Sequence, residues 1–259
     1  MTLFRQFFGA QFKGLLIWVG VAALFALSGT RSGATFVEGD AMAKMPQALL
    51  SIYGDIGGLS AIDAYLTLIL GKGTGLIPTL YAVILALSVV TREVDRRTVE
   101  FLLSLPVQRT QVLLSRLAVL ILNVTALVGA MWAVLRYDLP AQGYEASWGS
   151  LGLIFLNLWM LSIAVGAVTL AVSMWIDDYS LGVKLFLGAV TLAYFMEYVL
   201  RAAHVSRAAR VFSPFSYLEP TSIMRSGSIA TGSIIVLVVT VAAGVAVSFW
   251  AFNRKQFSA

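Results

Sequence analysis

The sequence predicts an all-α integral membrane protein with six transmembrane helices. Of its 259 residues, 59% are hydrophobic and only 12% are charged, whereas a soluble domain carries about 25% charged residues. One soluble core could not bury so much apolar surface, so lipid is the expected surrounding. Two apolar windows are also bounded by basic residues 20 positions apart, Lys72 with Arg92 and Arg116 with Arg136. A helix of that length spans roughly 30 Å, the thickness of the hydrocarbon layer.

Composition also excludes several kinds of site. The chain has no cysteine, which rules out disulfide bonds and thiolate metal sites. Its single histidine, His204, rules out a multi-histidine metal centre. The net charge of +5 is spread among the apolar stretches rather than gathered in one patch. A membrane protein with basic cytoplasmic loops explains that distribution better than a nucleic-acid-binding protein does.

Charge-free windows place the expected elements along one transmembrane domain, residues 1–259. The six spans are expected at 14–30, 73–91, 117–135, 150–176, 182–199 and 229–252. Outer loops are expected at 31–71, 136–149 and 197–225. The fifth span has the shortest charge-free window, 185–196, so its depth in the membrane stays open.

Both termini are expected in the cytoplasm, because the short, charge-dense segment 91–109 favours the inner side. An amphipathic helix lying on the inner membrane surface is predicted before the first span. Its apolar face consists of Phe4, Phe7, Phe8, Phe12 and Leu15. A cleavable signal peptide ending near Ser28 is the alternative interpretation of this start. Lys72 and Arg116 are expected to extend to the water boundary of their spans.

Four basic residues follow the fifth span at intervals of three, namely Arg201, His204, Arg207 and Arg210. The simple interpretation is a basic helix in the outer headgroup layer. The more specific interpretation is a contact site for an anionic substrate. Glu197 lies four residues before Arg201, a spacing at which the two side chains pair on a helix. In the loop after the fourth span, Asp177 and Asp178 are expected to cap or turn the chain.

The motifs of several enzyme classes are missing. A phosphate-binding loop has the pattern G-x-x-x-x-G-K-[ST], and the closest stretch, ILGKGTG at 69–75, lacks the first glycine and the hydroxyl residue. No catalytic, cofactor-binding or metal-binding residue is therefore expected in this chain. No ionisable residue is expected near the midplane of a span, which argues against a proton-coupled carrier.

The charged segment after the second span predicts an amphipathic cytoplasmic helix over 92–106. Its apolar stripe consists of Val94, Thr98, Phe101, Leu102 and Leu105. Pro106 ends the helix because it cannot donate a backbone hydrogen bond, and Arg109 begins the next segment. Two interpretations remain open on these grounds, a helix that anchors the loop in lipid headgroups and a helix on which another protein docks.

The residues of this segment resemble a known signature. The order Glu93-x-Asp95-x-x-Thr98-x-Glu100-Phe101-Leu102-Leu103-Ser104-x-Pro106-x-x-Arg109 is similar to that of permease subunits of ATP-binding-cassette (ABC) exporters of the type-2 (ABC-2) family. The stretches FRQFFGAQFKGLLIW, MPQALLSIYG and SPFSYLEP resemble the family more loosely. One position departs from the pattern, since Arg97 stands where the family has glycine.

The resemblance implies a set of partners and a role for the cytoplasmic helix. Two permease subunits, identical or homologous, pair in the membrane, and a separate ABC ATPase subunit that binds ATP and magnesium docks beneath each. The helix 92–106 is then a coupling helix that carries the motion of the ATPase to the spans. The residues assigned to this coupling are Glu93, Thr98, Glu100, Phe101, Leu102, Pro106 and Arg109. Membrane lipids are the remaining partners, and the location is the plasma membrane of a bacterium or archaeon.

The expected function is ATP-driven export of a hydrophobic or amphipathic substrate by alternating access. Drug-like molecules, peptides and lipids all fit, because the spans offer mainly aromatic, leucine and methionine surfaces. The alternative is a non-transporting sensor or assembly protein whose docking helix recruits a cytoplasmic partner. An integral membrane enzyme acting on lipids is a third hypothesis, although its acids and bases are scattered along the chain.

Overall fold

The computed structural model describes residues 2–38, 58–95, 109–176, 178–203 and 205–254, and all regular elements in these ranges are helices. Five helical stretches are long and apolar enough to cross a membrane: Gln11–Gly33, Thr110–Ala141, Trp148–Ser173, Tyr179–Ala202 and Thr231–Arg254. The long helices are α1 (Thr2–Glu38), α4 (Leu76–Asp95), α6 (Arg109–Ala141), α7 (Trp148–Ser173), α8 (Tyr179–Ala202) and α10 (Thr231–Arg254). The short elements are α3 (Ala61–Leu66), η1 (Thr67–Lys72), η2 (Gly73–Gly75), η3 (Arg207–Arg210), η4 (Pro214–Tyr217) and α9 (Pro220–Ser226).

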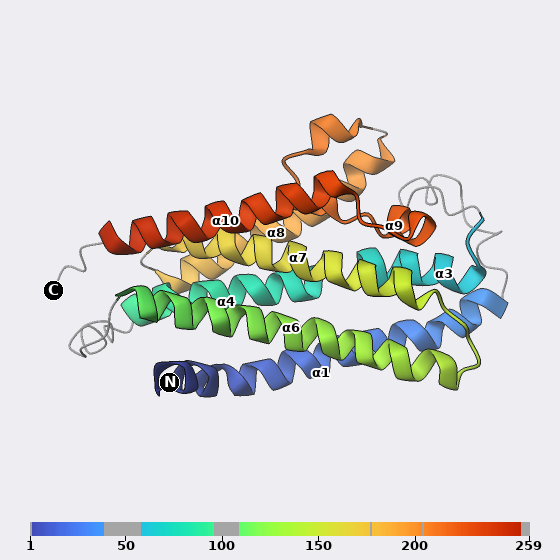
Figure 1. Cartoon of the computed structure of the whole chain (residues 1–259), viewed down its shortest axis with the longest axis horizontal. Coiled ribbons are helices and arrows are strands. Elements are labelled where there is room, and N and C mark those ends of the chain that lie inside the picture. The colour runs from blue at the N-terminus through green and yellow to red at the C-terminus, as the bar shows by residue number, and fades with distance from the viewer. Residues whose placement is uncertain (1, 39–57, 96–108, 177, 204, 255–259) are drawn as a thin grey trace.

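The six long helices form an elongated bundle in which successive helices run in alternating directions (Figure 1). The start of α1 and the end of α10 lie at one end of the bundle, which we call the terminal end, where α4 also stops and α6 begins. The short helices α3 and α9 lie at the opposite end, which we call the α9 end. This alternation is the arrangement expected of a chain that crosses a layer repeatedly.

Helix α7 is the centre of the bundle. Of its most apolar window, 67% is buried, whereas the figure for α8 is 17%. It packs on α4, α6 and α10, while α8 packs chiefly on α4. Most residues of α7 are buried, and its sequence contains no charged side chain. A helix that is apolar all round is expected in such a central position.

Helices α7 and α10 approach most closely at Gly244. A Cβ atom added to Gly244 would lie 2.8 Å from the carbonyl carbon of Ala167 and 2.9 Å from its oxygen. Ser248, one turn further along α10, is also fully buried. Small residues at such a crossing let two helix backbones come into contact within a membrane, and this contact sets the spacing of α7 and α10.

Polar side chains connect α6 to its neighbours α4 and α7. The Tyr81 hydroxyl donates to Asn123 Oδ1 at 3.0 Å, and the Asn123 amide donates to the Val119 carbonyl at 2.7 Å. Trp159 Nε1 donates to Thr125 Oγ1 at 2.9 Å. Hydrogen bonds between helices stabilise bundles in lipid, where no water replaces a missing partner.

Two carboxylates hold the α9 end together. Asp63 of α3 accepts the Ser147 backbone N–H at 3.1 Å and its hydroxyl at 2.8 Å, which joins α3 to the start of α7. Asp138 of α6 accepts hydrogen bonds from Thr30 and Arg31 of α1, the latter at 3.1 Å. Both acids anchor segments that are far apart in the sequence.

Helices α1 and α4 differ from the expected elements. Helix α1 runs without a break from Thr2 to Glu38, so the first outer loop begins later than residue 31 and the N-terminal amphipathic stretch is not a separate helix. Its position on a membrane surface stays a prediction. Between α3 and α4 the chain is interrupted by the π-helix η1 and the 3₁₀-helix η2. The described apolar part of α4, Leu76–Ser88, is shorter than the other candidate spans, and the count of six stays a prediction.

The expectation that Arg116 extends to the water boundary is wrong. Its side chain is 4% exposed, among the buried residues Leu113 and Leu117. The physical reason is that α6 begins seven residues earlier, at Arg109, and packs on α1, α4 and α7, so that the bundle covers Arg116. Arg116 therefore lies about 10 Å inside the helix rather than at its end. The side chain of Lys72 is outside the described residues.

Candidate functional site

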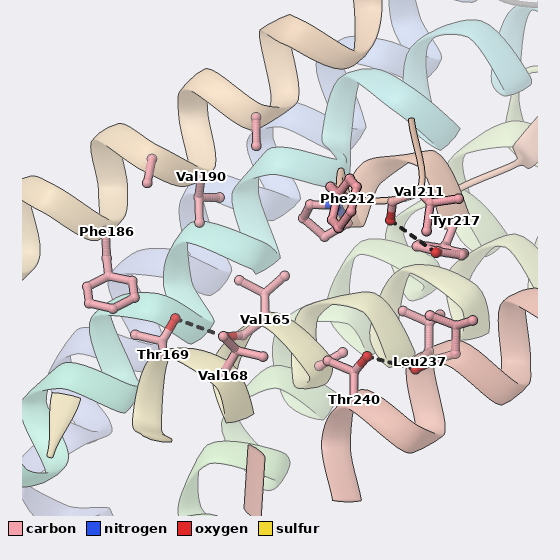
Figure 2. Close-up of a pocket in the computed structure, with 15 residues that line it drawn as sticks. Val165, Val168, Thr169, Phe186, Val190, Val211, Phe212, Tyr217, Leu237 and Thr240 are labelled. Carbon is pink, nitrogen blue, oxygen red and sulfur yellow. Dashed lines mark hydrogen bonds between the residues drawn. The ribbon is translucent and has the colours of Figure 1, made fainter. Parts of the chain in front are cut away.

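A groove of about 360 Å³ separates α8 from α7 and α10 (Figure 2). It exists because α8 packs chiefly on α4, while α7 and α10 pack tightly on each other. The irregular segment 211–217, which includes η4, covers one part of the groove. The labelled lining residues are Val165, Val168, Thr169, Phe186, Val190, Val211, Phe212, Tyr217, Leu237 and Thr240.

Helical spacing explains which side chains line the groove. Phe186, Val190 and Ala193 of α8 stand at intervals of four and three, so they lie on one face of the helix. Val236 and Thr240 of α10 are likewise four residues apart. Each helix therefore contributes a short stripe, and the stripes face one another across the groove.

The walls of the groove are apolar even where a hydroxyl is present. Thr169 donates to the Val165 carbonyl at 2.8 Å, and Thr240 donates to the Val236 carbonyl at 2.7 Å. The Tyr217 hydroxyl donates to the Val211 carbonyl at 3.1 Å. All three protons are thus directed to the protein backbone, as the dashed lines in Figure 2 show. Such a surface suits the hydrocarbon part of a ligand.

Phe215 anchors the segment that covers the groove. It is 3% exposed, and its ring meets Tyr194 edge to face with the centroids 5.2 Å apart. Pro214 begins the 3₁₀-helix that presents this ring. Phe212, three residues earlier, is 95% exposed at the rim of the groove. One aromatic residue is therefore fixed in the protein while the other is free to contact lipid or ligand.

A charged cluster lies next to the groove at the α9 end. Glu197 is only 3% exposed. Its Oε1 atom accepts from Arg201 Nε at 2.6 Å and from Arg210 Nη1 at 2.6 Å. Arg210 also donates from Nε to the Val205 carbonyl at 3.1 Å, which holds the guanidinium group in place. One negative charge thus faces two positive charges, which are 17% and 14% exposed.

The structure changes the interpretation of the predicted basic residues. The expected pairing of Glu197 with Arg201 is confirmed, but the expectation of one basic helix through Arg210 is wrong. Helix α8 ends at Ala202, and a separate 3₁₀-helix carries Arg210 back toward Glu197. Buried Glu197 is the physical reason, since an acid with so little exposure needs charged partners. His204 and the side chain of Arg207 lie outside the described residues.

Asp178 has the capping role expected from the sequence. Its Oδ1 atom accepts the Leu181 backbone N–H at 2.9 Å at the start of α8. A carboxylate in this position satisfies one of the free N–H groups of the first turn. Asp177 is outside the described residues.

The residues assigned to coupling lie at the terminal end or outside the description. Glu93 belongs to the last turn of α4, and Arg109 is the first residue of α6, although their side chains are not described. The other five, Thr98, Glu100, Phe101, Leu102 and Pro106, fall in the undescribed range 96–108. Their roles stay predictions. What the structure does establish is that α4 ends and α6 begins at the same end of the bundle (Figure 1).

No group of three or more histidine, cysteine, aspartate or glutamate side chains gathers within the described ranges. The charged cluster holds a single carboxylate, Glu197, and its two partners are cations. This donor set suits an anion rather than a metal ion.

The groove between α8, α7 and α10 was not predicted from the sequence. Valine, alanine and phenylalanine residues that line it look the same as residues that face lipid. The one signal in the sequence was the four-residue spacing from Ala193 to Glu197 to Arg201, which places charge one and two helical turns beyond the groove residue Ala193.

Nearly the whole chain matches a known protein family. A family model described as ABC-2 family transporter protein matches residues 14–257. The match includes both sides of the groove, the charged cluster and the segment between α4 and α6. A search of curated proteins found no match to the sequence.

Proposed function

Because the chain belongs to the ABC-2 transporter family, and is therefore a membrane transporter subunit, we propose that it is the membrane-spanning subunit of an ATP-driven exporter. The substrate is a hydrophobic or amphipathic molecule. The observation that supports this substrate class is the apolar groove between α8, α7 and α10, whose three hydroxyl groups are bonded to the backbone.

In this proposal the chain crosses the membrane six times, with α4 as the second span. The 20 residues of α4 correspond to about 30 Å of helix, enough for the hydrocarbon layer. The alternating directions of the long helices and the common position of the two termini support an even number of crossings (Figure 1). The terminal end faces the cytoplasm, and the α9 end faces outward.

ATP is hydrolysed by separate ABC ATPase subunits that dock at the terminal end. The segment 96–108 follows α4 and precedes α6, so a force on it reaches two neighbouring helices of the bundle. Glu93 and Glu100 hold the coupling helix by polar contacts, and Arg109 contacts a carboxylate or a headgroup phosphate. Phe101, Leu102 and Pro106 supply the apolar contact and the end of the helix.

Two membrane subunits work together by alternating access. Closure of the ATPase pair moves the coupling helices, and the path between the membrane subunits then opens outward. The apolar residues of α8 that face away from its neighbours are available for lipid or for a second subunit; they include Leu185, Leu192, Phe195 and Val199. The alternative of a sensor or assembly protein uses the same segment for recruitment but requires no ATP.

Co-purification tests the proposal. The chain is expressed with candidate ABC ATPase subunits from the same genome, isolated in mild detergent, and assayed for bound ATPase and for ATP hydrolysis. We expect a stable ATPase complex, whose association is lost with Glu93→Lys or Glu100→Lys. The matched control is Glu145→Lys, because Glu145 is an exposed acid at the α9 end. An ATPase complex indifferent to both coupling variants would contradict the assigned residues, and the absence of any complex would favour the sensor.

A further inference from the structure

The charged cluster directly follows the groove along α8. On α8 the groove residues Val190 and Ala193 are followed at the same helical spacing by Glu197 and Arg201. Glu197 is about 6 Å and Arg201 about 12 Å further along the helix than Ala193. Arg210 directly precedes the groove residue Val211 in the sequence. The charged cluster thus lies one to two helical turns beyond the groove, toward the α9 end, where Glu197 and Arg201 line a second, smaller pocket.

The charges in this cluster are unbalanced. Glu197 contributes one negative charge, and Arg201 and Arg210 contribute two positive charges, which gives a net charge of +1 for the three side chains. All three are mostly shielded from solvent. An excess charge in such a place is unfavourable unless a counter-charge is close. An anionic group at the end of the groove would supply that counter-charge.

The apolar wall by itself does not select a ligand in a membrane. Bulk lipid is as apolar as the side chains of the groove, so a hydrocarbon chain gains little by entering it. Selection must therefore come from the charged end, where hydrogen bonds to ionised groups are stronger than neutral ones. Arginine binds phosphate and carboxylate groups in a fixed, planar geometry.

We propose that this groove binds an anionic amphiphile, with one hydrocarbon chain between α8 and α10 and a phosphate or carboxylate headgroup at Arg201 and Arg210. The volume of about 360 Å³ is at the low end of the roughly 300–1,000 Å³ of ligand pockets, which suits a chain rather than a bulky ring system. The groove follows α8 from Phe186 to Ala193, about 10 Å. That such a molecule is the exported substrate rests on the proposed function.

Photolabelling tests the site on the full chain in lipid nanodiscs without an ATPase. The probes are phosphatidylglycerol and phosphatidylcholine that carry the same photoactivatable acyl chain, and labelled peptides are identified by mass spectrometry. We expect phosphatidylglycerol to label the groove about tenfold more strongly than phosphatidylcholine, since one charge-assisted hydrogen bond changes affinity by about that factor. The label should fall on segments that line the groove, such as 186–193 and 236–240.

A series of charge variants separates anion binding from a purely structural role. Glu197→Gln raises the net charge of the cluster to +2, Arg210→Gln lowers it to 0, and the double variant restores +1. The preference for phosphatidylglycerol should follow this order, with the double variant close to the wild type. If the cluster had only a structural role, labelling would fall in every variant in proportion to the loss of thermal stability. The thermal stability of each variant is measured in parallel. Arg136→Gln is the charge control, because Arg136 stacks on Trp148.

Blocking the groove tests where the chain binds. Ala193→Phe places a ring in the groove, whereas Leu192→Phe is the matched control because Leu192 is 63% exposed on α8. We expect Ala193→Phe alone to abolish labelling of the groove. Equal labelling by the two lipids, or a preference that ignores the charge series, would overturn the inference.

Experiments with the ATPase distinguish the site from the transport proposal. Charge-dependent binding by a chain that forms no ATPase complex would leave the site intact and contradict the proposed function. ATP-driven export of a neutral molecule, without any preference for the anionic lipid, would support the proposed function and overturn the present inference.

Discussion

Replacement of Gly244 by alanine tests the close contact between α7 and α10, one helical turn beyond the groove residue Thr240. The new Cβ atom would lie 2.8 Å from the Ala167 carbonyl carbon, 2.9 Å from its oxygen and 3.0 Å from its Cβ. Two of these three atoms belong to the backbone, so no side-chain rotation relieves the overlap. The two helices must move apart to accommodate the methyl group.

The size of the effect follows from two opposing contributions. Alanine is favoured over glycine within a helix by about 0.8–1.0 kcal/mol. Overpacking of a tight core contact is unfavourable by about 1–3 kcal/mol. Gly188 provides the matched comparison, because it lies within α8 and an added Cβ would meet no atom within 4 Å. Helix propensity is common to both substitutions, so Gly244→Ala should be less stable than Gly188→Ala by about 1–3 kcal/mol.

Unfolding of the two variants in detergent, followed by tryptophan fluorescence, measures this difference. We expect Gly188→Ala to unfold at or above the wild-type midpoint and Gly244→Ala below it. Equal midpoints for the two variants would refute the backbone contact between α7 and α10. A larger residue, as in Gly244→Val, should lower the midpoint further.

Two further predictions concern the carboxylates at the α9 end. Asp63→Ala removes the acceptors of both Ser147 hydrogen bonds and should destabilise the protein by about 1.5–3 kcal/mol. Ser147→Ala removes only the hydroxyl bond and should destabilise it by about 1 kcal/mol. Equal losses of stability in unfolding experiments would argue against the bond from the Ser147 backbone to Asp63. Arg31→Gln should lower stability by less than about 1 kcal/mol, because the Arg31 side chain is 67% exposed and its ion pair is screened by water and salt. Asp138→Ala should destabilise more, since the Asp138 side chain is 11% exposed and also accepts from Thr30 of α1 and from Gln142, the residue after α6. An Arg31→Gln variant as unstable as Asp138→Ala would contradict this ranking.

The positions of the long helices were largely predictable from the sequence. Residues 150–176 and 229–252 were expected to span the membrane, and the structure has α7 at Trp148–Ser173 and α10 at Thr231–Arg254. The agreement has a local cause, because charged residues are excluded from the hydrocarbon layer and so delimit each span. The pairing of Glu197 with Arg201 and the cap at Asp178 were also local and were confirmed.

Relations between distant segments were not predictable in this way. Arg210 joins Glu197 from 13 residues away, and only the end of α8 at Ala202 makes that return possible. Asp63 bonds to Ser147, which lies 84 residues later in the sequence, after α4 and α6. Arg116 was expected at the water boundary because the charge-free window begins at residue 117, but its burial comes from the packing of α6 in the bundle, which spacing along the chain does not reveal.

The class of protein and the approximate positions of the long helices could be predicted from composition and charge, because the exclusion of charge from lipid acts on each segment separately. The packing of the helices was needed to show that α7 is central, that Gly244 meets Ala167, and that a groove separates α8 from α7 and α10. The physical reason is that residues facing lipid and residues facing another helix are equally apolar in a membrane protein. Hydrophobicity therefore locates a span but does not say which of its faces meets a neighbour, and the groove depends on that choice.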